Sequence, residues 1–125
     1  MLKDKSSSAI VAVTDIDRAR SFYRDTLGLP LDDDGEMGDV LVFRTDATHL
    51  VVYRSEYAGT NKANAVVWGV GEEIDAIAKS LKAKGVTFEH YPDAGTLNGD
   101  VHVSGSFKMV WFKDPDGNIL HYNSM

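Results

Sequence analysis

The side chains of this chain best suited to proton transfer or metal binding are its four histidines and 19 acidic residues, because cysteine is absent. Without cysteine, the sequence excludes disulfides, thiolate metal sites and thiol nucleophiles. His121 is the histidine with the best-defined setting, because it follows the segment Asp114–Asn118. An imidazole with an ordinary pKa of about 6.5 suits general-base catalysis or metal binding. His121 is therefore the candidate catalytic residue.

The segment before His121 predicts a tight turn between two strands. It reads Asp114-Pro115-Asp116-Gly117-Asn118 and lies between two apolar runs. Proline fixes φ near about −65°, glycine tolerates positive φ, and Asp and Asn side chains bond back to the turn backbone. His121 is thus expected on the strand that follows, four residues after Gly117.

The rest of the chain shows one plan twice. A shift of 57 residues places Val13 on Val70 and Gly28 on Gly85, so that strand ends and helix ends coincide. The last hairpins align at a shift of 70 residues, with Val51 on His121. Besides the final hairpin, apolar spacing predicts strands at 11–13, 31–33, 40–44, 49–54, 65–70 and 86–90, and helices over 14–27 and 72–84.

The repeat predicts an α+β fold of two tandem βαβββ modules. We expect a single domain over 1–125, with module one at 7–54, a linker at 55–63 and module two at 64–124. One module cannot bury its apolar face alone, so the two are expected to form a curled eight-stranded sheet around a shared cleft. The alternative is two ferredoxin-like or unrelated α+β units with coincidental spacing.

The two shifts differ by 13 residues, and the extra residues fall in 91–106. This segment is rich in Gly, Asp, Asn and Ser, and it is longer than most connections between elements. It is predicted to be a surface loop, either functional or mobile.

Two groups of residues carry a resemblance to a known family. They are Val13-Thr14-Asp15, Ala19, Phe22-Tyr23 and Leu27-Gly28-Leu29 in the first half, and Asp114–Asn118 in the second. With the tandem βαβββ plan, this pattern resembles the vicinal oxygen chelate superfamily, which includes glyoxalase I, bleomycin-resistance proteins and extradiol dioxygenases. The resemblance covers roughly residues 7–124. It implies the fold strongly and a particular reaction weakly.

The resemblance also implies where a metal would bind. The superfamily's metalloenzymes place their ligands on the inner faces of four strands, at positions that correspond here to Ser8, Val51, Ala65 and His121. Those enzymes usually carry Glu where this chain has His121. Val and Ala cannot ligate and a serine hydroxyl is a poor ligand, whereas a divalent transition metal usually needs about three His, Asp, Glu or Cys ligands. We therefore predict no metal and no other cofactor.

Strand alternation predicts which side chains line the cleft, because residues two apart share a face. The inner walls are expected to be mostly apolar with a few polar groups, which is typical of small-molecule sites. His102, in the predicted loop, is a candidate lid residue. The alternative for His49 is that it faces solvent, and the alternative for Trp111 is that it fills the core. The predicted ligand-binding residues are Ser8, Ile10, Ala12, His49, Val51, Tyr53, Ala65, Val67, Gly69, His102, Trp111 and His121. The residues predicted to pack under the helices are Val11, Val13, Val66, Trp68 and Val70.

The composition excludes several partners. The net charge of −6, from 13 basic and 19 acidic residues, argues against nucleic acid and against an anionic membrane surface. The first residues lack the apolar core of a signal peptide, and no apolar run approaches the roughly 18 residues of a membrane span. A cytoplasmic location is expected.

Three functions compete. The first is a metal-free binding protein for an apolar or aromatic small molecule, as bleomycin-resistance-like proteins sequester antibiotics; such proteins commonly form symmetric homodimers. The alternative is a lyase or dioxygenase-like enzyme that uses His121 as general base, or as one ligand of an atypical metal site. The third is a partner-binding module without a ligand, which no charged tail or exposed amphipathic stripe favours.

Overall fold

The computed structural model describes residues 1–35 and 38–125, which form two compact units. Unit 1 comprises Met1–Thr60 and unit 2 comprises Asn61–Met125. The connection between the strands predicted at 31–33 and 40–44 contains residues 36–37, which lie outside the described residues. Its flanks are joined, because the Gly38 N–H donates to the Gly35 carbonyl at 2.9 Å.

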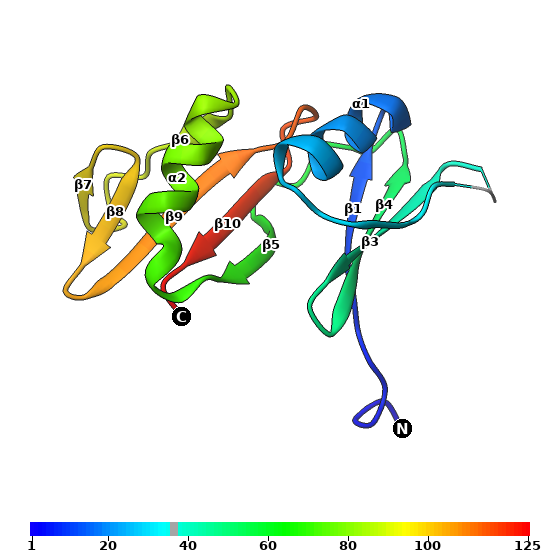
Figure 1. Ribbon diagram of the computed structural model, residues 1–125, viewed down its shortest axis with the longest axis horizontal. Helices are drawn as coiled ribbons and strands as arrows, with labels where there is room; N and C mark the ends of the chain where they lie inside the picture. The colour runs from blue at the N-terminus through cyan, green and yellow to red at the C-terminus, as the bar shows by residue number, and fades with distance from the viewer. Residues whose placement is uncertain (36–37) are drawn as a thin grey trace. The chain divides into compact units, whose positions relative to one another are not determined.

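Unit 1 is a four-stranded sheet with a helical segment on one face (Figure 1). Its elements are β1 (Ala9–Val13), α1 (Ile16–Arg20), η1 (Ser21–Thr26), β2 (Leu31–Asp33), β3 (Val40–Thr45) and β4 (Thr48–Arg54). The strand order in this sheet, sheet A, is β1-β4-β3-β2, and only the β1–β4 pair is parallel. The predicted βαβββ plan is confirmed here.

The helical segment of unit 1 begins and packs as its sequence predicts. The Asp15 side chain caps α1 by accepting the Arg18 N–H at 3.1 Å. Ala19 and Tyr23, both in the predicted apolar stripe, are buried. From Ser21 the segment widens into a π-helix. The Leu27 N–H there donates to the Phe22 carbonyl, five residues earlier, at 2.9 Å. An apolar stripe alone does not reveal this wider winding.

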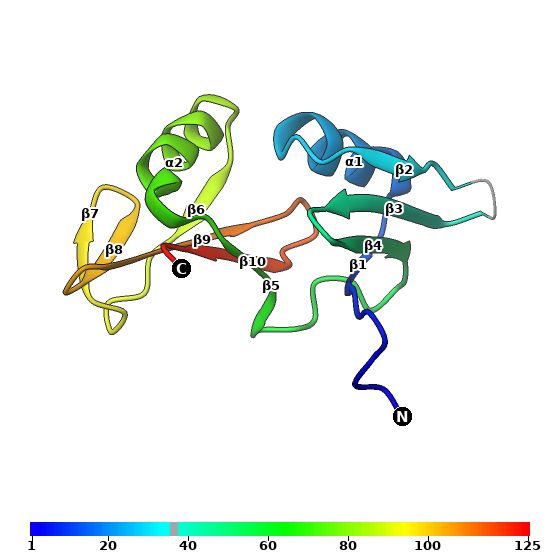
Figure 2. The same cartoon turned by 60° about the horizontal axis from the view of Figure 1, so that its bottom comes forward.

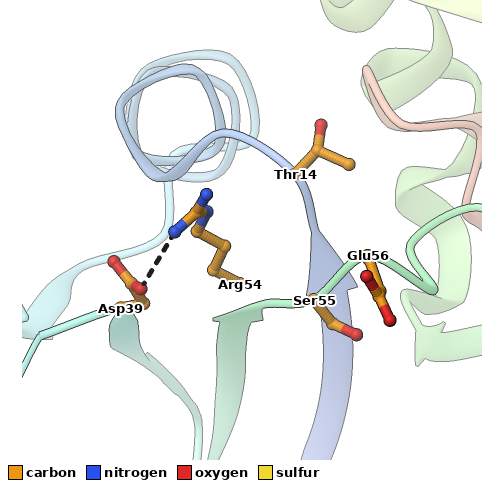
Figure 3. A pocket seen from close by; sticks show the side chains of 5 residues that line it. All are labelled: Thr14, Asp39, Arg54, Ser55 and Glu56. Atoms are coloured by element: carbon orange, nitrogen blue, oxygen red, sulfur yellow. Dashed lines mark hydrogen bonds and ion pairs between the residues drawn. The ribbon is translucent and has the colours of Figure 1, made fainter.

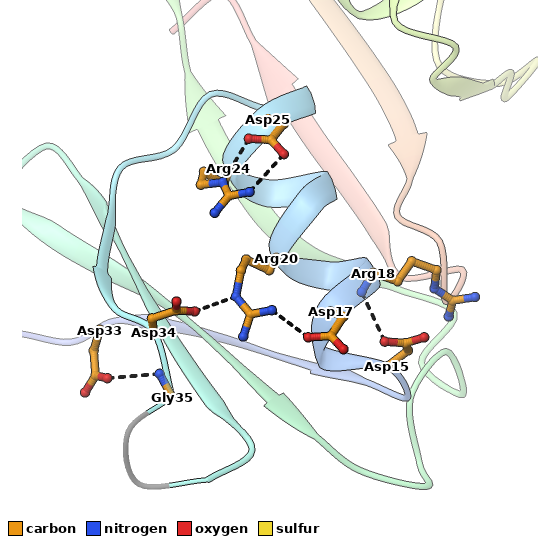
Figure 4. A network of polar contacts seen from close by, with 9 residues as sticks. All are labelled: Asp15, Asp17, Arg18, Arg20, Arg24, Asp25, Asp33, Asp34 and Gly35. Atoms are coloured by element: carbon orange, nitrogen blue, oxygen red, sulfur yellow. Dashed lines mark hydrogen bonds and ion pairs between the residues drawn. The ribbon is translucent and has the colours of Figure 1, made fainter.

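Arg20 ties the helical segment to the chain that follows β2. Its guanidinium donates to Asp17 at 2.6 Å and also to Asp34, so that one side chain bridges two segments (Figure 4). Hydrogen bonds to these two carboxylates raise the pKa of Arg20. The bridge fixes the start of the connection between β2 and β3.

Unit 2 repeats the plan with an additional hairpin. Its elements are β5 (Asn64–Gly69), η2 (Gly71–Glu73), α2 (Ile74–Ala83), β6 (Thr87–Glu89), β7 (Thr96–Asn98), β8 (Val101–Ser104), β9 (Phe107–Lys113) and β10 (Ile119–Asn123). In its sheet, sheet B, the order is β5-β10-β9-β8-β7, and β6 also pairs with β9. The helix α2 lies over the face that includes β8 and β9 (Figure 2).

The prediction of a surface loop over 91–106 is wrong. The segment contains β7 and β8, and β8 extends the sheet by pairing with β9. The reason lies in β9, because β6 pairs only with its residues 111–113 and leaves the edge at 107–109 open for β8. Sheet B therefore has six strands, so the described chain has ten strands instead of the eight predicted.

The core of each unit lies between its helix and one face of its sheet. Val11 and Val13 are buried at 2% and 1% exposure, and Val66 at 9%, as strand alternation predicts. Trp68 and Val70 are only half-buried. The opposite faces carry no helix within the described ranges, and large apolar side chains stay exposed there.

The turn Asp114–Asn118 has the predicted conformation. The Asp114 carboxylate accepts the N–H groups of Asp116 and Asn118 at 3.0 and 2.8 Å, and also the Asn118 side-chain amide at 2.8 Å. Gly117 has φ of 88°, which few other residues adopt easily. The turn fixes the register of β9 and β10, and with it the position of His121.

The α+β fold class and the βαβββ plan of both modules are confirmed. No helix in the described part of the chain is both long and apolar enough to cross a membrane.

Candidate functional site

The face of sheet A that turns away from α1 is apolar and open. Strand register places its side chains in two rows across β1, β4 and β3. The exposed fractions are 61% for Ile10, 38% for Val40 and 36% for Tyr53. A continuous exposed apolar patch of this kind is typical of a binding surface. This apolar face consists of Ile10, Val51 and Val42 in one row and Ala12, Tyr53 and Val40 in the next.

Three polar side chains lie next to the apolar face on the side of the β3–β4 hairpin. Arg44 and His49 are the next register pair of β3 and β4. Both approach Asp32 on β2: Arg44 Nη2 donates to Oδ1 at 3.1 Å, and His49 Nε2 lies 3.5 Å from Oδ2. The Arg44 and His49 side chains are 58% and 47% exposed. The sequence prediction included His49 and missed the other two residues.

Sheet B carries an aromatic–histidine cluster, which consists of Tyr91, His102, Trp111 and His121. His121 stacks on Trp111 with ring centroids 4.6 Å apart and planes 21° apart. His102 and Tyr91 meet the Trp111 ring at nearly right angles, at 4.9 and 5.2 Å. Such edge-to-face contacts are favourable for aromatic rings and stiffen the cluster. Three predicted site residues, on three different strands, therefore meet here.

His121 is buried, at 7% exposure, and both of its ring nitrogens are engaged. Nδ1 must donate to the Val110 carbonyl, 3.0 Å away, so Nε2 accepts from the Asn123 amide at 3.2 Å. The Asn123 orientation is fixed in turn, because its Oδ1 accepts the Met125 N–H at 3.1 Å. Burial lowers the pKa of His121, and the Val110 hydrogen bond opposes this only in part. The imidazole is therefore held neutral, with its lone pair directed at an amide.

His102 is a strand residue, not a loop residue. It lies on β8 with 1% of its surface exposed, and its Nε2 accepts the Tyr91 N–H at 2.9 Å. Burial lowers the pKa of His102, while the Met109 carbonyl raises it and His90 lowers it further. A lid role would require this buried side chain to leave its backbone partner.

The remaining predicted residues lie on or near the helix-free faces. Val67 is 58% exposed and is the register neighbour of His121, while Ala65 stands two residues earlier on β5. Gly69 lies against the chain end, because a Cβ there would be 3.2 Å from the Met125 carbonyl oxygen, which accepts the Gly71 N–H at 2.9 Å. Ser8 precedes β1 and is exposed.

The residues at the expected metal positions do not fit a metal ion. Val51 and Ala65 offer no ligating atom, and the lone pair of His121 is already bonded to Asn123. The register neighbours of His121 are Val67 and Trp111, which offer none either. Across the residues that the structure describes, no three His, Asp or Glu side chains are grouped to hold an ion.

A polar depression of about 490 Å³ lies elsewhere in unit 1, at the ends of β1 and β4 (Figure 3). It combines hydroxyl groups with charges of both signs, and Arg54 Nη1 lies 3.5 Å from Asp39 Oδ2 inside it. No sequence pattern predicts this depression, because its residues come from separate strand ends and from the linker. The lining residues are Thr14, Asp39, Arg54, Ser55 and Glu56.

Comparison of the sequence with protein families gives one match. The model of the Glyoxalase/Bleomycin resistance protein/Dioxygenase superfamily matches residues 6–122. No match was found among curated protein sequences.

Solved structures show the same fold at low sequence identity. The fosfomycin resistance protein FosX from Listeria monocytogenes is 14% identical, with a TM-score of 0.74 over 100% of this chain and 93% of that chain. Lactoylglutathione lyase from Agrobacterium tumefaciens is 17% identical, with a TM-score of 0.74 over 98% and 95%. The oxidase ChaP-H2 is 19% identical, with a TM-score of 0.70 over 99% and 95%. At these identities the similarity concerns the fold and leaves the activity open.

Proposed function

Because the chain belongs to the Glyoxalase/Bleomycin resistance protein/Dioxygenase superfamily, we propose that it is a metal-free protein that binds a small molecule with an apolar or aromatic body. The observation that supports this most is the open apolar face of unit 1, with Ile10 61% exposed. A sheet face without a covering layer leaves apolar surface in water, and a bound ligand would remove it. Sheet B adds exposed Val67 beside Trp111 and His121.

The proposal favours binding over catalysis. A general base must present a free lone pair to its substrate, and that of His121 faces Asn123. The similarity to a fosfomycin resistance protein makes sequestration of an antibiotic one form of this function. Like other proteins of this type, the chain is proposed to form a symmetric homodimer, for which light scattering should give twice the chain mass of 13.7 kDa.

The test uses tryptophan fluorescence with a panel of biphenyl, naphthalene and anilinonaphthalene compounds. The chain has two tryptophans, so the Trp68→Phe variant reports on Trp111 alone and the Trp111→Phe variant on Trp68 alone. We expect at least one compound to raise the melting temperature by mass action, and a compound that binds the helix-free face of sheet B to change Trp111 emission more than Trp68 emission. If no compound produced either effect, the proposal would fail.

An enzymatic function is the second candidate, and the lowered pKa of His121 supports it. A neutral imidazole becomes a competent base once Asn123 turns away from Nε2. The superfamily similarity to a lyase and an oxidase gives the reaction classes to assay. In this case Asn123→Ala should raise turnover and His121→Gln should abolish turnover while ligand affinity is kept.

A further inference from the structure

We infer that the ligand of the apolar face is an amphipathic organic acid, whose carboxylate is bound by Arg44 and His49. The inference rests on the proposed function, since it names the class of small molecule that this face takes. It starts from the end of the apolar face at the β3–β4 hairpin, where Arg44 and His49 form the next register pair.

The spacing of the rows sets the length of such a ligand. Successive rows on one face are two residues apart along a strand, or roughly 6.6 Å. The Arg44–His49 pair therefore lies about 7 Å from the row of Val51 and about 13 Å from the row of Tyr53. An aromatic body of one or two rings with a terminal carboxylate spans this distance. A compact ion or a long acyl chain fits it less well.

Arg44 has the donors that a carboxylate requires. A guanidinium carries five N–H groups in a planar fork, and this fork matches the two oxygens of a carboxylate. The bond to Asp32 uses Nη2 at 3.1 Å, and the Arg44 side chain is still 58% exposed. Donors thus remain toward solvent, while Asp32 acts as a positioning residue for the fork.

The distribution of charge favours an acid over a base. None of the six residues of the apolar face is charged. The exposed donors at its polar end belong to Arg44 and His49, whereas Asp32 is only 33% exposed and has each oxygen facing one of them. A cationic head group would approach the Arg44 guanidinium before it reached the Asp32 carboxylate. An anionic head group would accept hydrogen bonds from the donors that face solvent.

The experiment compares two probes of equal shape by isothermal titration calorimetry. Biphenyl-4-carboxylate carries the acid, and biphenyl-4-carboxamide is its neutral counterpart. We expect the native protein to bind the acid at least tenfold more tightly than the amide. Arg44→Met keeps the apolar stem but removes the donors, so it should reduce this preference below twofold and leave amide affinity unchanged. His49→Gln should reduce the preference by a smaller factor.

The matched control is Arg24→Met, because Arg24 is 46% exposed and already paired with its neighbour Asp25 on η1. It should leave both affinities unchanged. Should Arg44→Met fail to fold, Arg44→Lys keeps the charge without the fork and should give an intermediate preference. Equal binding of both probes to the native protein, or an acid preference that survives in Arg44→Met, overturns the inference and leaves the proposed function standing. Binding of neither probe overturns the proposed function for this face.

Discussion

The hydrogen bonds of His121 and His102 hold both rings in the neutral state. The Asn123 amide and the Tyr91 N–H each donate to a ring Nε2, so protonation there would set two donors against each other. Each ring would have to break a hydrogen bond to take up a proton. The hydrogen-bond geometry and the burial of the two histidines therefore both disfavour their protonation.

Because protonation of these histidines is unfavourable in the folded protein, stability should fall as pH is lowered. The pKa values of His102 and His121 are lowered in the folded protein, whereas histidine in the unfolded chain titrates near about 6.5, so the unfolded state binds more protons. The contribution of these two histidines to the free energy of unfolding should be constant above about pH 7.5 and decrease from about pH 6.5 downward. Urea unfolding at several pH values measures this. His102→Gln and His121→Gln should each flatten the pH dependence, and higher stability in acid would contradict the argument.

Asp46 has a backbone conformation that suits glycine. Thr45 pairs with Thr48, so Asp46 and Ala47 form a two-residue hairpin connection in which Asp46 has φ of 52°. The first position of such turns favours glycine, and an L-residue there lowers the free energy of unfolding by about 1 kcal/mol. Asp46→Gly should raise the free energy of unfolding by about 1 kcal/mol in urea titrations. Ala47→Gly, with no positive φ to relieve, should lower it, and a loss of stability in both variants would exclude this explanation.

At the scale of elements, the β7–β8 hairpin is the main addition to the repeated plan. It supplies His102 to the aromatic–histidine cluster, and its Asp100 accepts a hydrogen bond from His90 Nε2 at 2.8 Å. Gly95, at the start of the hairpin, has φ of 105°, and a Cβ there would lie 2.5 Å from the Val103 carbonyl oxygen. The backbones of the two strands therefore approach each other closely at this point.

The close approach predicts different costs for two similar substitutions. Gly95→Ala should lower the free energy of unfolding by about 2–4 kcal/mol, because the new methyl group displaces backbone. Gly99→Ala, in the turn of the same hairpin, meets no atom within 4 Å and should cost about 1 kcal/mol for its positive φ alone. Urea midpoints of the two variants give the comparison. Equal costs would show that backbone strain, and not the contact, dominates.

Elements with periodic apolar residues could be predicted from the sequence. The stripe that contains Ala19 and Tyr23 located the first helix, and alternation placed Ile10 and Tyr53 on the open face. The strands β7 and β8 were not predicted, because they have only three and four residues and lie among the Gly, Asp, Asn and Ser residues of 91–106.

The site shows the same limit. Asp32 and Arg44 meet only because β2 pairs with β3 in a register that shifts between Leu31 and Asp33. Such an irregularity leaves no pattern in the sequence. The Val110 partner of His121 was likewise hidden, since its carbonyl is reached across the sheet and not along the chain.

At the scale of the whole molecule, the chain combines a superfamily fold with a site that does not suit a metal. Family membership over residues 6–122 describes the scaffold, while the residues around His121 decide the chemistry. Ligation by His121 would break its bond from Asn123 and gain no second ligand from Val67 or Trp111. The fold and the chemistry thus have to be assigned separately.

The described residues offer no suitable ligand set, which predicts that stability does not depend on metal. Protein purified without chelator should contain fewer than about 0.2 equivalents of Zn, Fe, Mn or Ni by elemental analysis, since bound catalytic metals approach full occupancy. Addition of EDTA should leave the melting temperature unchanged. One tightly bound equivalent, lost together with thermal stability in EDTA, would disprove the metal-free proposal.

The contacts of Met125 bear on how the protein is handled in the laboratory. Its N–H bonds to Asn123 and its carbonyl accepts from Gly71, so an affinity tag fused after it would pull on the amide that orients His121. Residues 1–8 are exposed and belong to unit 1, so a tag attached before them adds no residue next to Met125 along the chain. Ligand affinity measured with a tag after Met125 would therefore describe a protein in which the tag had disturbed the orientation of His121.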